Sequence, residues 1–349
     1  MSVAGLVEDL KQRLVAEPPL LRTPKTVQIL LIRQTHDYTV LRTEETRELN
    51  VVVTPTSAKN ARQMTRVVFL ASKQKAPETR QFASIVKNYY QQFKDNSGFK
   101  SVYDKALQNF KAKFKEQAVE KLEKSILNCE LKDLLCRTCP RCTLFGAVVT
   151  NESKLWERWN IKHRIEYSSA FSLESYETVA ENLTFNAVTE STQMTGQALG
   201  STENVSPLVN FASIVSLNSP TWEELVLVIK TLLVCKSYGA EGRVKGDVVN
   251  YITGLVFGNE EILTPLEYVL ELSDRDISDA VKATYDIAKK YGDEAAFPDA
   301  LRILTPEELR MFVDYVSRFQ MTPDFVGKAY ADSLNFALRV DAKAKEEEE

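Results

Sequence analysis

Three cysteines spaced two residues apart constrain this chain more than any other feature of its sequence. Cys136-Arg-Thr-Cys139-Pro-Arg-Cys142 is followed directly by Thr-Leu-Phe-Gly. Thiolates at this spacing lie on one tight turn and can reach a single soft metal ion, and zinc takes four ligands at about 2.0–2.3 Å. Because the chain has no His-Glu-x-x-His pattern, which is typical of an open catalytic site, the motif predicts a structural zinc.

The fourth zinc ligand must come from outside this motif. Cys129 is the nearest candidate, and His163, one of only two histidines, is the alternative. Two other interpretations of the cysteines stay open, namely buried free thiols and an iron–sulfur cluster. The bacterial ferredoxin pattern places a fourth cysteine where this chain has Gly146, and the intervening Arg, Thr and Pro are not typical of a core.

The location of the protein is suggested by its N-terminus and by its cysteine usage. Glu8 and Asp9 stand where a signal peptide carries basic residues, and no apolar run approaches the roughly 20 residues that span a bilayer. Clustered cysteines fit a reducing compartment better than a disulfide framework. We therefore expect a cytoplasmic protein with no membrane partner.

The charge of the chain is unevenly distributed, although its net value is only −4. Residues 1–115 hold 20 Lys/Arg and 10 Asp/Glu, whereas residues 259–349 hold 11 Lys/Arg and 21 Asp/Glu. Such asymmetry can indicate a basic half that meets phosphate, or head-to-tail assembly between copies. Two differently charged solvated surfaces are the third interpretation.

The order of apolar patterns predicts an α+β fold of ferredoxin-like or RNA-recognition type with large insertions. A short helix in residues 1–20 precedes strands at 26–33, 49–54 and 66–71, and residues 79–128 read as helical with a break at 96–98. The later elements are strands at 161–167, 183–188, 208–216 and 248–257, a helix from Ser219 to Tyr238, and C-terminal helices at 278–291, 306–319 and 324–340.

A polar segment at residues 189–207 separates two of these strands. It is too long for a tight hairpin turn, and loops of this length are usually functional or disordered. A second loop, Gly239-Ala-Glu-Gly-Arg-Val-Lys-Gly246, joins the Ser219 helix to the last strand.

These motifs together resemble the RAMP superfamily of CRISPR proteins. The segments that carry the resemblance are Cys136–Gly146, the glycine-rich loop 239–246 and Phe-Asn-Ala-Val-Thr-Glu at 185–190. The sequence is most similar to the backbone subunit of type I-D CRISPR effector (Cascade) complexes. This resemblance implies a palm that holds a crRNA guide, a long hairpin thumb, and several copies stacked along one guide. It also implies other subunits of the effector complex as partners, and target DNA recognised through guide base pairing.

The resemblance divides the chain into four parts. Residues 21–72 form the first part of the palm, 73–146 a helical insertion with the zinc knuckle, and 147–258 the second part of the palm with the thumb at 189–207. Residues 259–349 form a C-terminal helical region with an acidic tail.

Basic side chains and glycine-rich backbone are what phosphate binding requires. Arg243 and Lys245 lie in the glycine-rich loop, and Met194 offers an apolar wedge for the thumb. The remaining candidates for RNA binding lie in the first part of the palm: Arg33, Lys59, Arg62 and Arg66. For each set, an ordinary connection or surface charge is the plain alternative.

Catalysis is the poorer interpretation of this sequence. Asp37, after the first strand, corresponds to a loop in which related RNA-cleaving backbone subunits carry an acidic residue, but a His-Asp pair more often caps a turn. We expect a non-catalytic guide-RNA-binding scaffold. The alternative is that the same subunit cuts the target strand at regular intervals through Asp37.

Overall fold

The centre of the molecule is a mostly antiparallel sheet built around one fully buried strand. The computed structural model describes residues 2–42, 48–114, 116–130, 134–148, 159–188, 195–239 and 248–346. Strand β1 (Thr26–Thr35) is β-branched and almost continuously buried, as its sequence predicts, and it pairs antiparallel with β8 (Asn210–Asn218) and β9 (Val248–Gly258).

The complete sheet has the strand order β10-β9-β1-β8-β5-β3-β2, and β4 also pairs with β8. The outer strands are β2 (Val51–Pro55), β3 (Gln63–Phe69), β4 (Ile165–Tyr167), β5 (Ala170–Ser172) and β10 (Arg302–Ile303). Within it, four strands follow the order β9-β1-β8-β5, in which each neighbouring pair is antiparallel. Helix α2 (Ala71–Phe93) precedes β5 along the chain, and α7 (Trp222–Val234) connects β8 to β9.

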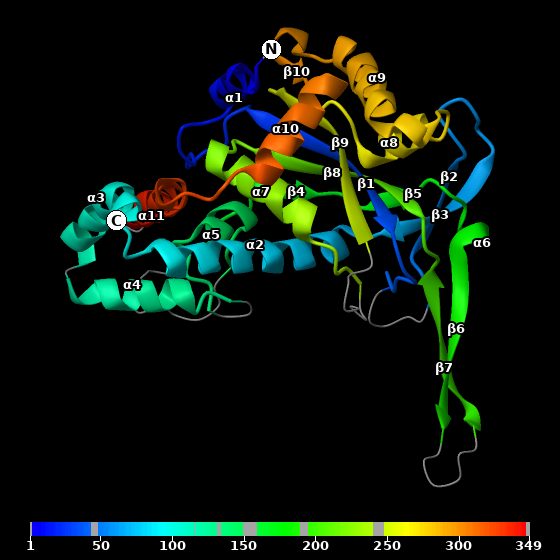
Figure 1. Cartoon of the computed structure of the whole chain (residues 1–349), viewed down its shortest axis with the longest axis horizontal. Coiled ribbons are helices and arrows are strands. Elements are labelled where there is room, and N and C mark those ends of the chain that lie inside the picture. Colours follow the sequence, from blue (N-terminus) through cyan, green and yellow to red (C-terminus); the bar gives the residue numbers. More distant parts are fainter. Residues whose placement is uncertain are drawn as a thin grey trace.

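Both faces of the sheet are covered, because alternate residues of β1 face different cores. Val27, Ile29 and Leu31 belong to a large core that includes residues of α2 and α7. Leu30 and Ile32 belong to a smaller core with residues of α8 (Pro265–Leu272) and α9 (Ala280–Asp293). Figure 1 shows α8 and α9 on one side of the strands and α2 on the other.

The predicted helical segment at 79–128 consists of three helices. Helix α2 begins at Ala71, eight residues earlier than the apolar pattern indicates. Its first turns carry buried polar side chains, among them Gln74 and Glu78. Helices α3 (Ser97–Phe114) and α4 (Gln117–Leu127) follow the predicted break. Aromatic residues cluster between α2, α3 and the C-terminal helix, where the ring centroids of Tyr90 and Tyr330 lie 4.7 Å apart.

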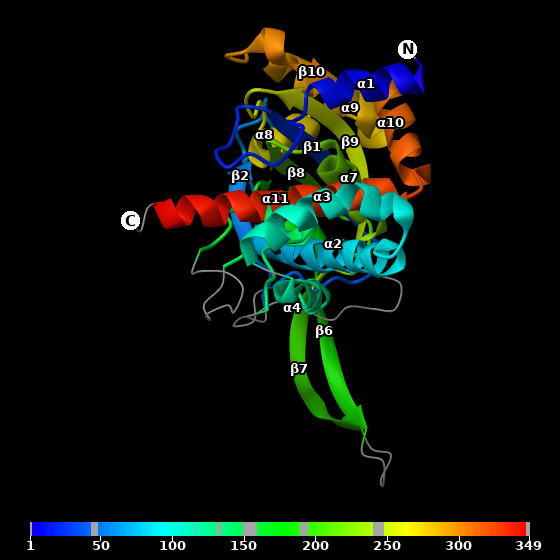
Figure 2. The ribbon, with the colours of Figure 1, turned by 90° about the vertical axis from the view of Figure 1, so that its left-hand side faces the viewer.

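The two ends of the chain pack onto this core. Helix α1 is shorter than predicted, spanning Val3–Gln12, and α10 spans Pro306–Arg318. Helix α11 (Pro323–Glu346) runs beside α3, as both views show (Figures 1 and 2). Short elements complete the fold: α5 (Pro140–Phe145), α6 (Tyr176–Val179) and the 3₁₀ turns Ile277–Asp279 and Pro298–Ala300. None of the helices described has the length and apolar character needed to cross a membrane.

A two-stranded hairpin projects from the body, and here one sequence prediction is wrong. Residues 195–205 are expected to be loop, yet they form strand β7 (Thr195–Val205), which pairs with β6 (Ala180–Val188). The pairing is antiparallel from Ala180 opposite Val205 outwards. The segment lacks an apolar alternation because the hairpin projects away from the core, as Figures 1 and 2 show. Its strands are held by backbone hydrogen bonds.

Candidate metal centre and nucleic-acid interface

Four buried cysteine sulfurs converge at one point beside α2. Cys129, Cys136, Cys139 and Cys142 place their Sγ atoms within 4.8 Å of one another. The Sγ atom of Cys129 lies 3.5 Å from that of Cys142 and 3.8 Å from that of Cys139. A tetrahedron with Zn–S bonds of about 2.3 Å has sulfurs about 3.8 Å apart, so these spacings fit a four-coordinate zinc.

The local backbone explains how the motif forms this group. Arg137 adopts a left-handed conformation with φ of 64°, which tightens the turn between the first two cysteines. The backbone N–H groups of Cys136 and Thr138 donate to the sulfurs of Cys129 and Cys136, both at 3.4 Å. Pro140 occupies the first turn of α5, which carries Cys142. Backbone donors of this kind stabilise negative charge on sulfur.

The thiols need a cation to ionise together. Burial and the neighbouring sulfurs raise the pKa of Cys136 well above that of an ordinary thiol, and hydrogen bonds among the sulfurs raise the pKa of Cys139. A bound metal ion would displace these protons. Among the described residues this is the only group of His, Cys, Asp and Glu side chains arranged for a metal ion. The chemistry of its four donors is that of a closed, structural site.

The alternative ligand His163 is not a member of this group. His163 lies two residues after Ile161, whose carbonyl accepts a hydrogen bond from the backbone N–H of Ala147. The carbonyl of His163 itself accepts a hydrogen bond from Arg22. Burial lowers the pKa of His163, and Lys75 contributes to the same shift. Of the two candidates, the one that lies with the other three cysteines is therefore Cys129.

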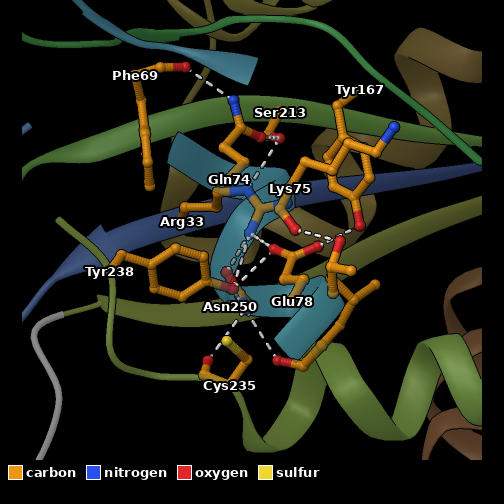
Figure 3. A network of polar contacts seen from close by, with 12 residues as sticks. Arg33, Phe69, Gln74, Lys75, Glu78, Tyr167, Ser213, Cys235, Tyr238 and Asn250 are labelled. Carbon is orange, nitrogen blue, oxygen red and sulfur yellow. Dashed lines mark hydrogen bonds and ion pairs between the residues drawn. The ribbon is translucent and has the colours of Figure 1, made fainter. Parts of the chain in front are cut away.

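Arg33 does not present its side chain to RNA, contrary to the sequence-based interpretation. Its guanidinium is fully buried and donates to Glu78 at 2.5 Å, to Asn250 at 2.8 Å and to Ser213 at 3.0 Å. Figure 3 shows this network, in which Tyr238 donates to the same Glu78 oxygen as Arg33 and Tyr167 donates to the other oxygen. Sequence reasoning missed Glu78 because it lies 45 residues from Arg33, on a different element.

Arg66 is also buried, so its assignment to the RNA surface is corrected in the same way. Its guanidinium donates to Thr54 Oγ1 and to the carbonyls of Thr56, Ser172 and Leu173. These bonds fasten the β2–β3 hairpin to β5. Burial lowers the pKa of Arg66 to about 10, which at neutral pH still leaves the side chain charged.

Lys59 and Arg62 are exposed on the turn between β2 and β3. Neither forms an ion pair within the described residues, and the backbone of the turn is fixed, because the N–H of Lys59 donates to Asp274 at 3.0 Å. Arg243 and Lys245, in the glycine-rich loop, and Met194, in the segment between β6 and β7, lie outside the described residues.

Asp37 occupies a turn after β1. Its carboxylate accepts the backbone N–H of Tyr38 at 2.8 Å, which is the turn-capping role that the sequence analysis gave as the alternative. Nε2 of the neighbouring His36 lies 3.1 Å from Oε1 of Gln34 and 3.4 Å from the hydroxyl oxygen of Tyr251. Asp37 belongs to no metal-type cluster in the described parts of the chain.

A groove of about 650 Å³, lined mainly by polar and charged residues and here called the α2 groove, runs along α2 beside the cysteine centre, and the sequence analysis missed it. Arg80, Ser84 and Lys87 are among the side chains of α2 that line it, and their spacing of four and three residues places them on one face. Cys129, Glu130 and Arg141 form the other wall. Within the described residues neither Arg80 nor Lys87 forms an ion pair, so both charges are available to a ligand.

The family model and the solved structure that resemble this chain point to the same family. The sequence model of the family described as Csc2 Crispr matches residues 12–301. The fold is similar to the crystal structure of Thermofilum pendens Csc2, with a TM-score of 0.67 and 19% identity over 99% of this chain and 98% of that chain. The sequence has no match among curated proteins.

Two chains from CRISPR RNA-guided surveillance complexes are more distantly similar. One is from a pre-nicking complex, with a TM-score of 0.44 and 12% identity over 79% of this chain and 90% of that chain. The other has the same TM-score and identity over 86% of this chain and 96% of that chain. At these values the likeness carries no argument.

Proposed function

The chain belongs to the Csc2 CRISPR family, and from that premise we propose that it is a guide-RNA-binding scaffold subunit of a type I-D CRISPR effector complex. The single observation that carries this proposal is the family match over residues 12–301. In this role, copies of the chain would line up along a crRNA beside other subunits, and the guide would find target DNA by base pairing.

The arrangement of the sheet supports a palm of ferredoxin-like type. Such a palm has the strand order 4-1-3-2, and β9-β1-β8-β5 follows that order with α2 and α7 as the crossover helices. Residues 21–72 and 147–258 would then form the palm, interrupted by the insertion 73–146 and followed by the helical region 259–349. The projecting β6–β7 hairpin is the segment best suited to be the thumb, in place of 189–207 alone.

A zinc ion is the cofactor that the four cysteines fit. Cys129, Cys136, Cys139 and Cys142 would hold it, and its contribution would be to fasten the insertion to the palm rather than to react. This role follows from the burial of all four ligands, which leaves no open coordination position for a substrate.

The α2 groove is the proposed contact for the RNA backbone among the described residues. Arg80 and Lys87 are the unpaired cations on its α2 wall, and Lys59 and Arg62 form a second basic set on the β2–β3 turn. Phosphate contacts carry no base information, so binding through them should be independent of sequence. Arg243 and Lys245 stay candidates for the same backbone.

The test is RNA binding by the purified chain at several salt concentrations. Each lost phosphate contact flattens the slope of log affinity against log salt by roughly 0.7 for a single strand, so Arg80→Ala with Lys87→Ala should flatten it by about 1.4. The matched control is Lys289→Ala, an exposed lysine on α9 across the sheet. If the double variant binds like the control at every salt concentration, the α2 groove is not the RNA site.

A further inference from the structure

An apolar groove with a basic rim lies between the N-terminal segment and the end of α11. We call it the Leu21 groove; its volume is about 680 Å³, and Leu20, Leu21, Phe336 and Val340 supply apolar lining. Leu21 is 85% exposed and Leu20 is 45% exposed, which makes this one of the places in the described chain where large apolar side chains meet solvent. Exposed apolar surface in a groove favours a docked partner.

The rim of the groove carries positive charge. Lys162 and Lys343 are exposed beside it; Lys343 pairs with Glu346 at 3.1 Å, whereas Lys162 forms no ion pair within the described residues. Arg22 also lines the groove, although it is paired with Glu166 at 2.7 Å. A partner for this surface should therefore present an apolar side chain flanked by carboxylates.

The same chain presents such a segment elsewhere. The loop 293–299, here called the Phe297 loop, reads Asp-Glu-Ala-Ala-Phe-Pro-Asp and contains no basic residue. Phe297 is 57% exposed, and Asp293, Glu294 and Asp299 around it are exposed too. The backbone of the loop is held in place, because the N–H of Phe297 donates to Glu260 at 2.6 Å and its carbonyl accepts from Ala300 at 3.1 Å.

We propose that the Phe297 loop of one copy of this chain docks into the Leu21 groove of a second copy. An exposed aromatic ring would enter an apolar groove, and its three flanking carboxylates would meet the lysines of the rim. The loop is already fixed by hydrogen bonds, so docking costs little ordering entropy. The two surfaces lie on different parts of the molecule. The loop joins α9 to β10, which lie apart from the C-terminal end of α11 in Figure 2, and the groove is lined by residues from that end of α11.

The contact is therefore heterologous, and its repetition would link copies head to tail. It goes beyond the proposed function because it needs no RNA. A contact of this small size should be weak, so association should appear only at high protein concentration and should weaken with salt.

Sedimentation velocity over a concentration series, without RNA, tests the proposal. Phe297→Asp and Leu21→Asp should each weaken self-association by about tenfold or more, since each removes a buried apolar side chain from the contact. Mixing the two variants should produce dimers but nothing larger. In such a mixture the Leu21→Asp copy still offers its loop, and the Phe297→Asp copy still offers its groove.

Val234→Asp, which changes a 52% exposed valine at the end of α7, is the matched control and should associate like the wild type. A wild-type chain that stays monomeric at every concentration overturns the proposal. Variants that associate like the control, or a mixture that yields no dimer, overturn it as well. RNA affinity per chain, measured separately, should be the same for all of them, so failure of this contact and failure of RNA binding are distinguishable.

Discussion

Arg33 and Glu78 form an ion pair that is shielded from solvent on every side. Burial by itself would lower the pKa of Arg33, but the Glu78 carboxylate raises it, so the guanidinium stays charged. Burial and Glu78 together raise the pKa values of Tyr167 and Tyr238 well above normal, so both hydroxyls keep their protons and donate to Glu78. The network therefore fixes α2 against β1, β4 and the end of α7.

Glu78→Gln should destabilise the fold by about 3–5 kcal/mol, because it leaves the Arg33 charge buried without its counter-ion. The double variant Arg33→Met with Glu78→Gln should lose less, since it leaves no unpaired charge. Urea unfolding of the three proteins measures this difference. A Glu78→Gln protein as stable as the wild type would show that water reaches the pair.

Asp332 on α11 predicts a pH dependence of stability. Burial raises the pKa of its carboxyl to about 6, although Lys328, at 2.5 Å, pulls it down. The folded pKa lies above the unfolded value of about 3.9, so the native state holds the proton more tightly. The cost of ionising Asp332 is absent at low pH and is fully present above about pH 6.

Asp332→Asn should therefore gain stability relative to the wild type as the pH rises from about 4 to about 7, by up to about 3 kcal/mol. Thermal unfolding of both proteins across that range checks it. Asp314→Asn removes an exposed carboxylate on α10 and should show no comparable trend. A stability difference for Asp332→Asn that is constant with pH would contradict the shifted pKa.

The cysteine centre and the buried arginines show what sequence could and could not predict at this scale. Cys136, Cys139 and Cys142 were predictable because one short turn brings them together. Arg33 and Arg66 were misplaced because an arginine in a strand gives no local sign of its partners. Those partners lie on other elements, such as Glu78 on α2 and the carbonyls of β5.

At the scale of elements, the insertion that carries the cysteine centre is also joined to the C-terminal helix. Arg137 stacks on Trp159 at 4.6 Å, and the indole N–H of Trp159 donates to Asp341 on α11 at 2.9 Å. Asp341 also pairs with Lys113 of α3 at 2.5 Å. Loss of the metal should therefore loosen α3 and α11 as well as the knuckle.

Cys139→Ser should lower the zinc content from about one ion per chain and destabilise the fold, because a structural zinc contributes folding free energy directly. Elemental analysis and thermal unfolding are the two measurements. Cys235→Ser is the matched control, since Cys235 is buried but lies outside the cluster. Purified protein that contains neither zinc nor iron would contradict the assignment of a metal site.

The regular elements were predictable where their pattern reflects burial. The apolar runs of β1 and α7 gave correct elements, because both are almost fully buried. Strand β7 and helix α8 were missed for different reasons. The first lies on a hairpin that projects from the body (Figure 1), and the second is only eight residues long and begins with a proline, a residue that is also common in turns.

At the scale of the whole molecule, the charge asymmetry of the sequence is partly used inside the fold. Lys113, from the basic part of the chain, pairs with Asp341, from the acidic part, at 2.5 Å. The acidic part of the chain, residues 259–349, also supplies α8 and α9, which cover the face of the sheet opposite α2. The α2 groove and the cysteine centre thus lie on the side of the sheet that α2 covers, away from the face covered by α8 and α9.

The hairpin predicts how copies of the molecule line up. Its base is anchored, since the carboxylate of Glu203 accepts the backbone N–H of Leu49 at 2.5 Å and Thr39 pairs with Val205. Leu183 lies opposite Thr202. Replacing residues 184–201 with Asn-Gly should therefore close a short type I′ hairpin without disturbing the body.

We expect the shortened protein to fold, to keep its metal and to bind a short RNA as the wild type does, because the α2 groove is untouched. It should fail to form regular filaments on a long guide RNA, since the hairpin, which projects from the body in Figure 1, is the element that we propose to reach a neighbouring copy. Electron microscopy of both proteins with the same RNA is the measurement. A version that keeps the chain length but exchanges residues 189–194 for glycine and serine separates the effect of hairpin length from that of the side chains between β6 and β7. Filaments of normal length and regularity from the shortened protein would show that the thumb lies elsewhere in the chain.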